Sequence, residues 1–167
     1  MDESLSPAVF FDIGGTLASP KLSSPPPRLD RLIVYPYVPT VLQELRDRRV
    51  RLGVISNTGD ETAERMQIIL EQCGLYDFFD PSLLLYSSVV GLEKDSPEIF
   101  RLAASRAGHP TLPERCIFVG EDSRERSFAL AAGLRAASHP LLAREVLDGA
   151  GLRYVRVTVP NDGGDTR

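Results

Sequence analysis

The sequence predicts an α/β protein with one central parallel sheet between two layers of helices. Short apolar runs of four or five residues alternate with longer segments whose apolar residues recur at helical spacing, a pattern typical of parallel sheets covered on both faces. The chain has 167 residues, 43% of them hydrophobic and 25% charged. These values are those of an ordinary globular protein with a single core.

Strands are expected where apolar and β-branched residues form short runs bounded by turn residues. The runs that meet this criterion are Ala8–Phe11, Arg51–Ile55, Leu83–Tyr86, Cys116–Val119 and Leu134–Ala137. Residues Tyr154–Val159 have the composition of one further strand, at an edge of the sheet.

Four helices are predicted from apolar residues spaced three, four and seven apart. Their core positions are Val38, Val41, Leu42 and Leu45 in the first, Ala63, Met66, Leu70 and Cys73 in the second, Ile99, Leu102 and Ala103 in the third, and Phe128, Ala131 and Ala132 in the fourth. We expect Asp60 to cap the start of the second helix and Gly133 to end the fourth.

Two segments show neither the strand pattern nor the helical spacing of apolar residues. Residues 19–27 contain four prolines and three serines, so they cannot form a regular helix, and we expect an extended flap there. Residues 161–167 are polar and rich in glycine and aspartate, and we expect them to be a disordered tail. The sequence thus predicts one domain over residues 1–160.

Charge and composition exclude several classes of function. The net charge is −4 and the pI about 5.2, so no nucleic-acid partner is expected. No apolar run approaches the roughly 20 residues of a membrane span, and the N-terminus lacks a basic leader, so we predict a cytoplasmic protein without a membrane partner. Cys73 and Cys116 are expected to be free buried thiols, and with only two histidines a zinc site has no support.

The first candidate site is the segment after the first predicted strand. Asp12 ends an apolar run and is followed by Ile13, Gly14, Gly15 and Thr16. Glycines let bare backbone approach an anion, while the carboxylate projects from the edge of the sheet. An ordinary glycine turn would have the same local sequence, so the assignment depends on polar residues further along the chain.

Three further polar positions occur in order after this segment. Ser56 and Asn57 end the second predicted strand, and Lys94 lies in the run Gly-x-x-Lys-x-x-Pro. Glu121 and Asp122 come directly after Gly120 at the end of another strand, with Glu125 four residues after Glu121. Because the carboxyl ends of parallel strands share one edge, we expect these side chains to surround one cavity. The acids would also complement the dipole of a helix N-terminus.

Acid, hydroxyl, lysine and acids in this order resemble the four motifs of the haloacid dehalogenase (HAD) superfamily, over roughly residues 8–137. The resemblance implies a three-layer Rossmann-like fold and a phosphatase-like hydrolase. Only 44 residues separate Asp12 from Ser56, and 38 separate Ser56 from Lys94, which leaves no room for a cap domain. Members without a cap have open sites, so the phosphorylated substrate could be a macromolecule, or a partner subunit could cover the site.

The resemblance also implies a role for each residue. Asp12 would be the nucleophile, with Ser56 and Lys94 as the other catalytic residues. Phosphate would bind Gly15, Thr16, Ser56, Asn57 and Lys94. Mg²⁺ would be held by Asp12, the carbonyl of Gly14, and acids among Glu121, Asp122 and Glu125.

Two positions depart from the family pattern. Gly14 stands where phosphatases of the superfamily carry a second aspartate, the general acid and base of the reaction, whose help is typically worth about 10²–10⁴-fold. Glu121 stands where the family usually has aspartate, so either Glu121 or Asp122 would take the metal. Three hypotheses are compatible with these residues: a phosphohydrolase whose acid step is impaired or assisted by the substrate, a degenerate phosphate-binding or regulatory module, and carbon-centred hydrolysis of the dehalogenase type, against which the missing cap argues.

Overall fold

The fold is built on a five-stranded parallel sheet. The computed structural model describes residues 6–23, 25 and 28–149. The sheet has the order β5-β4-β1-β6-β7, and every neighbouring pair is parallel. Its strands are β1 (Ala8–Phe11), β4 (Arg51–Ser56), β5 (Leu84–Tyr86), β6 (Cys116–Val119) and β7 (Arg135–Ala137). The predicted α/β class is confirmed, and each predicted strand within the described residues is present to within one residue at either end.

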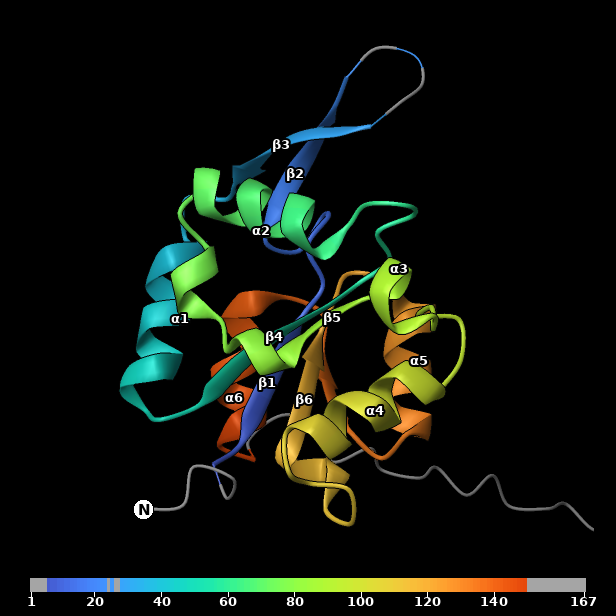
Figure 1. Ribbon diagram of the computed structural model, residues 1–167. Coiled ribbons are helices and arrows are strands. Elements are labelled where there is room, and N and C mark those ends of the chain that lie inside the picture. Colours follow the sequence, from blue (N-terminus) through green and yellow to red (C-terminus); the bar gives the residue numbers. More distant parts are fainter. Residues whose placement is uncertain (1–5, 24, 26–27, 150–167) are drawn as a thin grey trace, which may run out of the picture.

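Helices cover both faces of this sheet (Figure 1). They are α1 (Val38–Asp47), α2 (Ala63–Gln72), α3 (Ser87–Val90), α4 (Glu98–Arg106), α5 (Ser123–Ala131) and α6 (Ala143–Leu147). Among the described residues, short 3₁₀ turns lie in the connections: η2 (Tyr76–Phe78), η3 (Pro81–Leu83), η4 (Pro113–Arg115) and η5 (Pro140–Leu142). The three layers are those of a single Rossmann-like domain.

Strand β1 shows how the two layers are packed. Successive side chains of a strand point to opposite faces, so Val9 and Phe11 pack in the cluster formed with α1, α2 and α6. Ala8 and Phe10 pack in the second cluster, with α4 and α5. All four side chains are fully buried, which explains why the strand is apolar at every position instead of alternating.

A separate antiparallel hairpin follows β1. Strands β2 (Ala18–Leu22) and β3 (Leu29–Val34) form their own two-stranded sheet, which stands beyond the carboxyl edge of the central sheet, beside α2 (Figure 1). The first part of the expected flap is therefore extended, as the prolines indicate. The pairing with β3 was not expected from the sequence, because Pro20 lies within β2, opposite Leu32, and proline lacks the amide that strands use.

The helix termini test the two capping predictions. Asp60 does not cap α2, so that prediction is wrong: the N-cap is Thr62, whose Oγ1 accepts a hydrogen bond of 3.2 Å from the Arg65 amide. The prediction for Gly133 is confirmed, because α5 ends at Ala131 and Gly133 follows its cap with a φ of 90°. The predicted strand at Tyr154–Val159 and the predicted tail lie outside the described residues.

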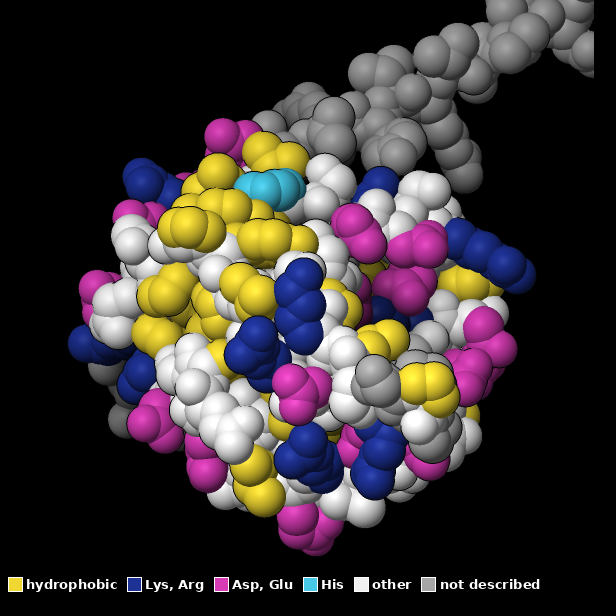
Figure 2. Space-filling view, turned by 90° about the horizontal axis from the view of Figure 1, so that it is seen from above, with side chains coloured by type: hydrophobic (Ala, Val, Ile, Leu, Met, Phe, Trp, Pro, Cys, Tyr) yellow, Lys and Arg dark blue, Asp and Glu magenta, His cyan; other side chains and the backbone are white. Residues whose placement is uncertain are grey.

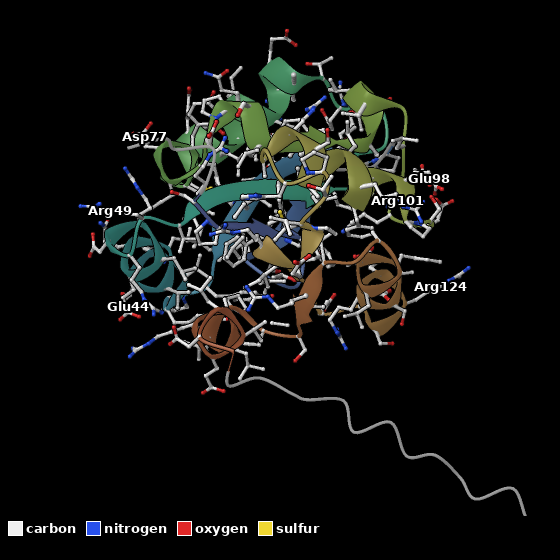
Figure 3. All side chains as sticks on the ribbon, turned by 90° about the horizontal axis from the view of Figure 1, so that it is seen from below. Glu44, Arg49, Asp77, Glu98, Arg101 and Arg124 are labelled. Carbon is white, nitrogen blue, oxygen red and sulfur yellow. The ribbon has the colours of Figure 1, made fainter. Side chains whose placement is uncertain are left out.

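The outer surface is charged. Seen from below, Glu44 of α1, Glu98 and Arg101 of α4, and Arg124 of α5 point outward around the sheet (Figure 3). Both cysteines are free thiols, Cys116 buried and Cys73 half-buried. In the described ranges no helix combines the length and apolarity that a bilayer span requires.

Candidate functional site

The predicted site residues meet at the carboxyl edge of the central sheet. Asp12 follows β1, Ser56 ends β4, and Glu121 lies just beyond β6. These three strands are neighbours in the order β4-β1-β6, so their ends converge where ligands bind in open α/β folds. The Asp12 amide donates to the Val119 carbonyl at 2.9 Å, which extends the β1–β6 ladder as far as Asp12. Acidic side chains gather on this face (Figure 2).

Lys94 lies at the centre of this group. Its Nζ is 2.5 Å from Asp12 Oδ1 and 2.8 Å from Glu125 Oε2, and only 2% of its side chain is exposed. The backbone amide of Lys94 donates to Asn57 Oδ1 at 3.0 Å. A buried ammonium is tolerated only when it is paired. Lys94 thus contacts Asp12 after β1, Asn57 after β4 and Glu125 of α5.

Glu125 is the acid with a raised pKa in this group. Burial raises the pKa of the Glu125 carboxyl, because desolvation disfavours the charged form, and Lys94 opposes this shift. Its carboxylate comes from the first turn of α5. The helix thus places one carboxylate beside the Asp12–Lys94 pair.

The loop after Asp12 is closed by hydrogen bonds and by a close contact. The Gly15 amide donates to the Ala18 carbonyl at 2.9 Å. Gly15 has a φ of +75°, and a Cβ there would lie 2.3 Å from Glu121 Oε1. Thr16 Oγ1 accepts from the Glu121 amide at 3.2 Å. Gly15 is therefore required both by its backbone conformation and by the Glu121 carboxylate that packs against it.

Gly14 is under neither constraint. Its φ lies outside the left-handed region, and a Cβ there would meet only Pro20 carbons, at 3.7 and 3.9 Å. These are ordinary van der Waals distances. The fold would therefore accept a side chain at this position. The backbone does not require glycine at residue 14.

Glu121 and Asp122 have different partners. Asp122 Oδ1 accepts from the amides of Arg124 at 2.7 Å and Glu125 at 3.2 Å. These bonds cap α5 and lower the pKa of the Asp122 carboxyl. Glu121 instead reaches back over the loop after β1. Of the two acids, Glu121 lies against the Gly14–Thr16 loop and Asp122 stabilises a helix end.

Arg126 is a residue of this site that sequence reasoning missed. Its Nη1 donates to the carbonyls of Gly120 at 2.7 Å and Glu121 at 2.6 Å. Gly120 itself is required by close packing, because a Cβ there would lie 2.8 Å from the Phe118 ring. Arg126 and Gly120 together hold the backbone from which Glu121 projects. No pattern in the sequence singles out Arg126 from its neighbours.

The site contains oxygen atoms of the chemical type that Mg²⁺ binds. In residues 6–23, 25 and 28–149, no group of three or more His, Cys, Asp or Glu side chains is arranged to hold a metal. Mg²⁺ usually takes only one or two protein carboxylates and completes its shell with water and substrate. Asp12, Glu121 and the backbone carbonyl of Gly14 carry oxygen atoms of that kind, so the chemistry of these residues is compatible with the ion.

A pocket of about 300 Å³ opens beside Gly14 and Ser56, between the β2–β3 hairpin and residues 56–61. Arg28 and Glu61 also line it, with Arg28 Nη2 3.5 Å from Glu61 Oε2. Sequence reasoning missed both residues. The sequence could have indicated Glu61, because it lies five residues after Ser56, at the end of a predicted strand. Arg28 follows a run of prolines, and no motif marks it.

Comparison with known proteins gives one family and several similar folds. A family model described as a hydrolase, haloacid dehalogenase-like hydrolase, matches residues 26–133. The matched range begins after Asp12, so the first motif is assigned from the sequence and its geometry. No curated protein matches the chain.

Solved structures share the fold at low sequence identity. An uncharacterized protein from Listeria monocytogenes serotype 4b is 15% identical over 86% of this chain and 98% of its own, with a TM-score of 0.70. A Had-superfamily hydrolase from Ehrlichia chaffeensis is 15% identical over 87% and 98%, with a TM-score of 0.63. A predicted phosphoglycolate phosphatase from Haemophilus somnus 129PT is 24% identical over 64% of this chain and 44% of its own, with a TM-score of 0.55.

The family match spans more than half of the chain, and the similar structures share its three-layer fold. The chain therefore belongs to the haloacid dehalogenase-like hydrolases.

Proposed function

We propose that this hydrolase cleaves phosphate from its substrate through a covalent aspartyl-phosphate at Asp12. The observation that carries the proposal is the buried Lys94 ammonium, 2.5 Å from the Asp12 carboxylate, at the edge where Ser56 and Asn57 also lie. A carboxylate that attacks a phosphoryl group needs nearby positive charge, because the two anions repel each other.

The residues have distinct tasks in this reaction. An Asp12 oxygen attacks phosphorus, and the bond to the leaving oxygen breaks. Water then attacks the acyl phosphate, which releases inorganic phosphate and restores the Asp12 carboxylate. Lys94 and the Ser56 hydroxyl stabilise the charge on the phosphoryl oxygens. Asn57 positions Lys94 through its 3.0 Å contact with the lysine amide, and Gly15 and Thr16 keep the loop close to the phosphate.

A bound Mg²⁺ would supply further positive charge on the phosphoryl oxygens. The residues that would hold it are Asp12, the Gly14 carbonyl and Glu121, with Glu125 near them and Asp122 engaged as the cap of α5. Glu121 is favoured over Asp122 because its carboxylate packs against Gly15, in the loop that also carries the Gly14 carbonyl.

Gly14 limits which substrates react quickly. Without an acid at this position, the leaving oxygen departs as an anion unless the substrate provides a proton. Acyl and aryl phosphates have stable leaving anions, so we propose that they are turned over faster than alkyl phosphates. The protein would work in the cytoplasm on a phosphorylated substrate.

The test is turnover of a phosphoester panel with Mg²⁺ by the wild type and by Asp12→Asn. We expect phosphate release from acyl and aryl phosphates, none above background in the variant, and a beryllofluoride adduct at Asp12. Absence of both turnover and adduct in a folded protein would rule the proposal out.

A phosphate-binding module without turnover is the second candidate. Gly14 favours it, because it replaces the aspartate that would transfer the proton, while Asp12 and Lys94 are both present. This function predicts phosphate binding by calorimetry with no product from any ester in the panel.

A further inference from the structure

The pocket beside Gly14 is placed to receive the leaving group of a substrate. It shares Gly14 and Ser56 with the candidate site, and its other walls come from the hairpin, residues 57–61 and Met66 of α2. A phosphate bound between Asp12 and Ser56 would direct its substituent toward this space, which a second acid at position 14 would narrow. The inference rests on the proposed function for the position of the phosphate.

The walls of the pocket are mainly apolar. Its apolar lining residues are Ile13, Pro20, Leu22, Leu29, Leu32 and Met66. Its volume of about 300 Å³ lies at the lower end of the range for small-molecule sites. The space suits a compact organic group, not an extended polymer.

Glu61 is a buried charged residue in this wall, whereas the other charged lining residues, Arg28 and Asp60, are exposed. Only 7% of its side chain is exposed, whereas the side chain of its partner Arg28 is 61% exposed and 3.5 Å away. A carboxylate can accept about four hydrogen bonds. Within the part of the chain that the structure describes, Arg28 is the one group that donates to this carboxylate, at the outer limit of a hydrogen bond.

A buried carboxylate with one long contact to a solvated arginine is poorly compensated, and buried charges are stable only when well paired. A ligand cation in the pocket would supply the missing partner, and Arg28 is exposed enough to move aside. We infer that this pocket binds a compact, mainly apolar leaving group that carries an ammonium group, which pairs with Glu61.

Three aryl phosphates of matched shape test the inference: 4-(aminomethyl)phenyl, 4-(hydroxymethyl)phenyl and 4-methylphenyl phosphate. Their affinities would be measured by calorimetry, with Mg²⁺, on Asp12→Asn, so that the measurement does not depend on turnover. We expect the ammonium ester to bind about tenfold more tightly than the methyl ester, as for a hydrogen bond to a charged group. Glu61→Gln in the same background should remove this preference.

Asp60→Asn is the matched control, because Asp60 is an exposed acid that also lines the pocket. It should change the preference by less than about twofold, as expected for a solvated charge. Unchanged affinity of Glu61→Gln for the methyl ester would show that this variant is folded and keeps the phosphate site.

Equal affinity for the three esters, a preference that survives Glu61→Gln, or equal binding of the hydroxyl and ammonium esters would overturn the inference. So would failure of every ester to bind. If the wild type turns over none of the esters while the preference is present, the proposed hydrolysis fails and the pocket assignment stands. If the wild type turns over the esters without the preference, the proposed hydrolysis stands and the pocket assignment fails.

Discussion

At the scale of single residues, the site combines a buried ion pair with a glycine that has room for a side chain. Lys94 neutralises Asp12 in a buried setting, whereas Gly14 offers only backbone. Because Gly14 is constrained neither by its φ nor by close neighbours, the fold would tolerate an acid at this position, where phosphatases of the superfamily carry one.

Gly14→Asp should therefore gain activity. We expect kcat/KM for an alkyl phosphate to rise by about 10²-fold, at the lower end of general acid catalysis, while an acyl phosphate, which needs little proton donation, changes by less than about threefold. Phosphate release measured for both substrates checks this selectivity. A folded variant with no gain on alkyl phosphates would contradict it.

Gly15→Asp is the contrasting variant at the next position. A side chain there would be strained by a φ of +75° and would meet the Glu121 carboxylate at 2.3 Å. Loss of activity in this variant, together with a lower melting temperature, would show that the gain at position 14 depends on local geometry.

Glu121→Gln and Asp122→Asn should separate the two candidate metal ligands. We expect Glu121→Gln to weaken Mg²⁺ binding by about tenfold or more in calorimetry, because Mg²⁺ prefers anionic oxygen ligands. Asp122→Asn should leave both metal affinity and helix stability nearly unchanged, since asparagine caps helices about as well as aspartate. The reverse result would assign the metal to Asp122.

The choice between these two acids shows how far sequence reasoning reaches at this scale. Motif order was sufficient to place Asp12, Ser56, Lys94 and Glu121 at one edge of a sheet. It could not separate adjacent acids, because the distinction depends on whether a carboxylate turns toward its own helix or toward the loop after β1. That orientation depends on tertiary contacts: the Glu121 amide donates to Thr16 Oγ1, and the Glu121 carboxylate packs against Gly15.

At the scale of elements, the strands were more predictable than their surroundings. Fully buried strands are apolar throughout and bounded by turn residues, so β1, β4 and β6 stand out in the sequence. The β2–β3 pairing does not, since Pro20 interrupts the usual strand signal. The start of α2 was misplaced for a related reason: Asp60 and Thr62 are both favourable caps, and only the observed backbone shows that Thr62 accepts the bond.

Gly53 lies at a point of close packing in β4. A Cβ there would lie 2.6 Å from the Leu83 carbonyl and 2.7 Å from Phe10 Cδ1. Gly53→Ala should therefore lower the free energy of unfolding by about 1–3 kcal/mol, as overpacked cores do. Urea denaturation measures the effect, and Ser105→Ala on the exposed side of α4 should change stability by less than about 0.5 kcal/mol. Similar values for the two variants would contradict the packing argument.

At the scale of the whole molecule, one ion pair connects several parts of the fold. Arg51 of β4 bonds to Asp80 at 2.7 and 3.1 Å and to the Ala107 carbonyl, just after α4, at 3.1 Å. Burial alone would raise the pKa of the Asp80 carboxyl, but hydrogen bonds from Ser82 and Arg51 outweigh it and lower that pKa below the ordinary 3.8. Arg51 thus links β4 with the start of η3 and with the chain after α4.

This shift predicts a dependence of stability on pH. Because the unfolded chain takes up a proton on Asp80 more readily than the folded one, the contribution of Asp80 to stability is present above its ordinary pKa and is lost as pH falls through the lowered pKa. Urea unfolding from about pH 5 down to about pH 2 should show this loss. Other carboxylates titrate in the same range, so the measurement is the difference from Asp80→Asn, whose stability should fall less steeply. Parallel curves for the two proteins would contradict the assignment.

The β2–β3 hairpin gives the molecule a modular organisation. It belongs to a different sheet from the strands that present Asp12, Ser56 and Glu121, yet it provides much of the wall of the pocket beside them. Under the proposed function, substitutions in the hairpin would therefore change which leaving groups bind without disturbing the strands that carry Asp12, Ser56 and Glu121. Because function depends on the site and not on the fold as a whole, such a separation would let selection change the specificity of this chain and preserve its proposed chemistry.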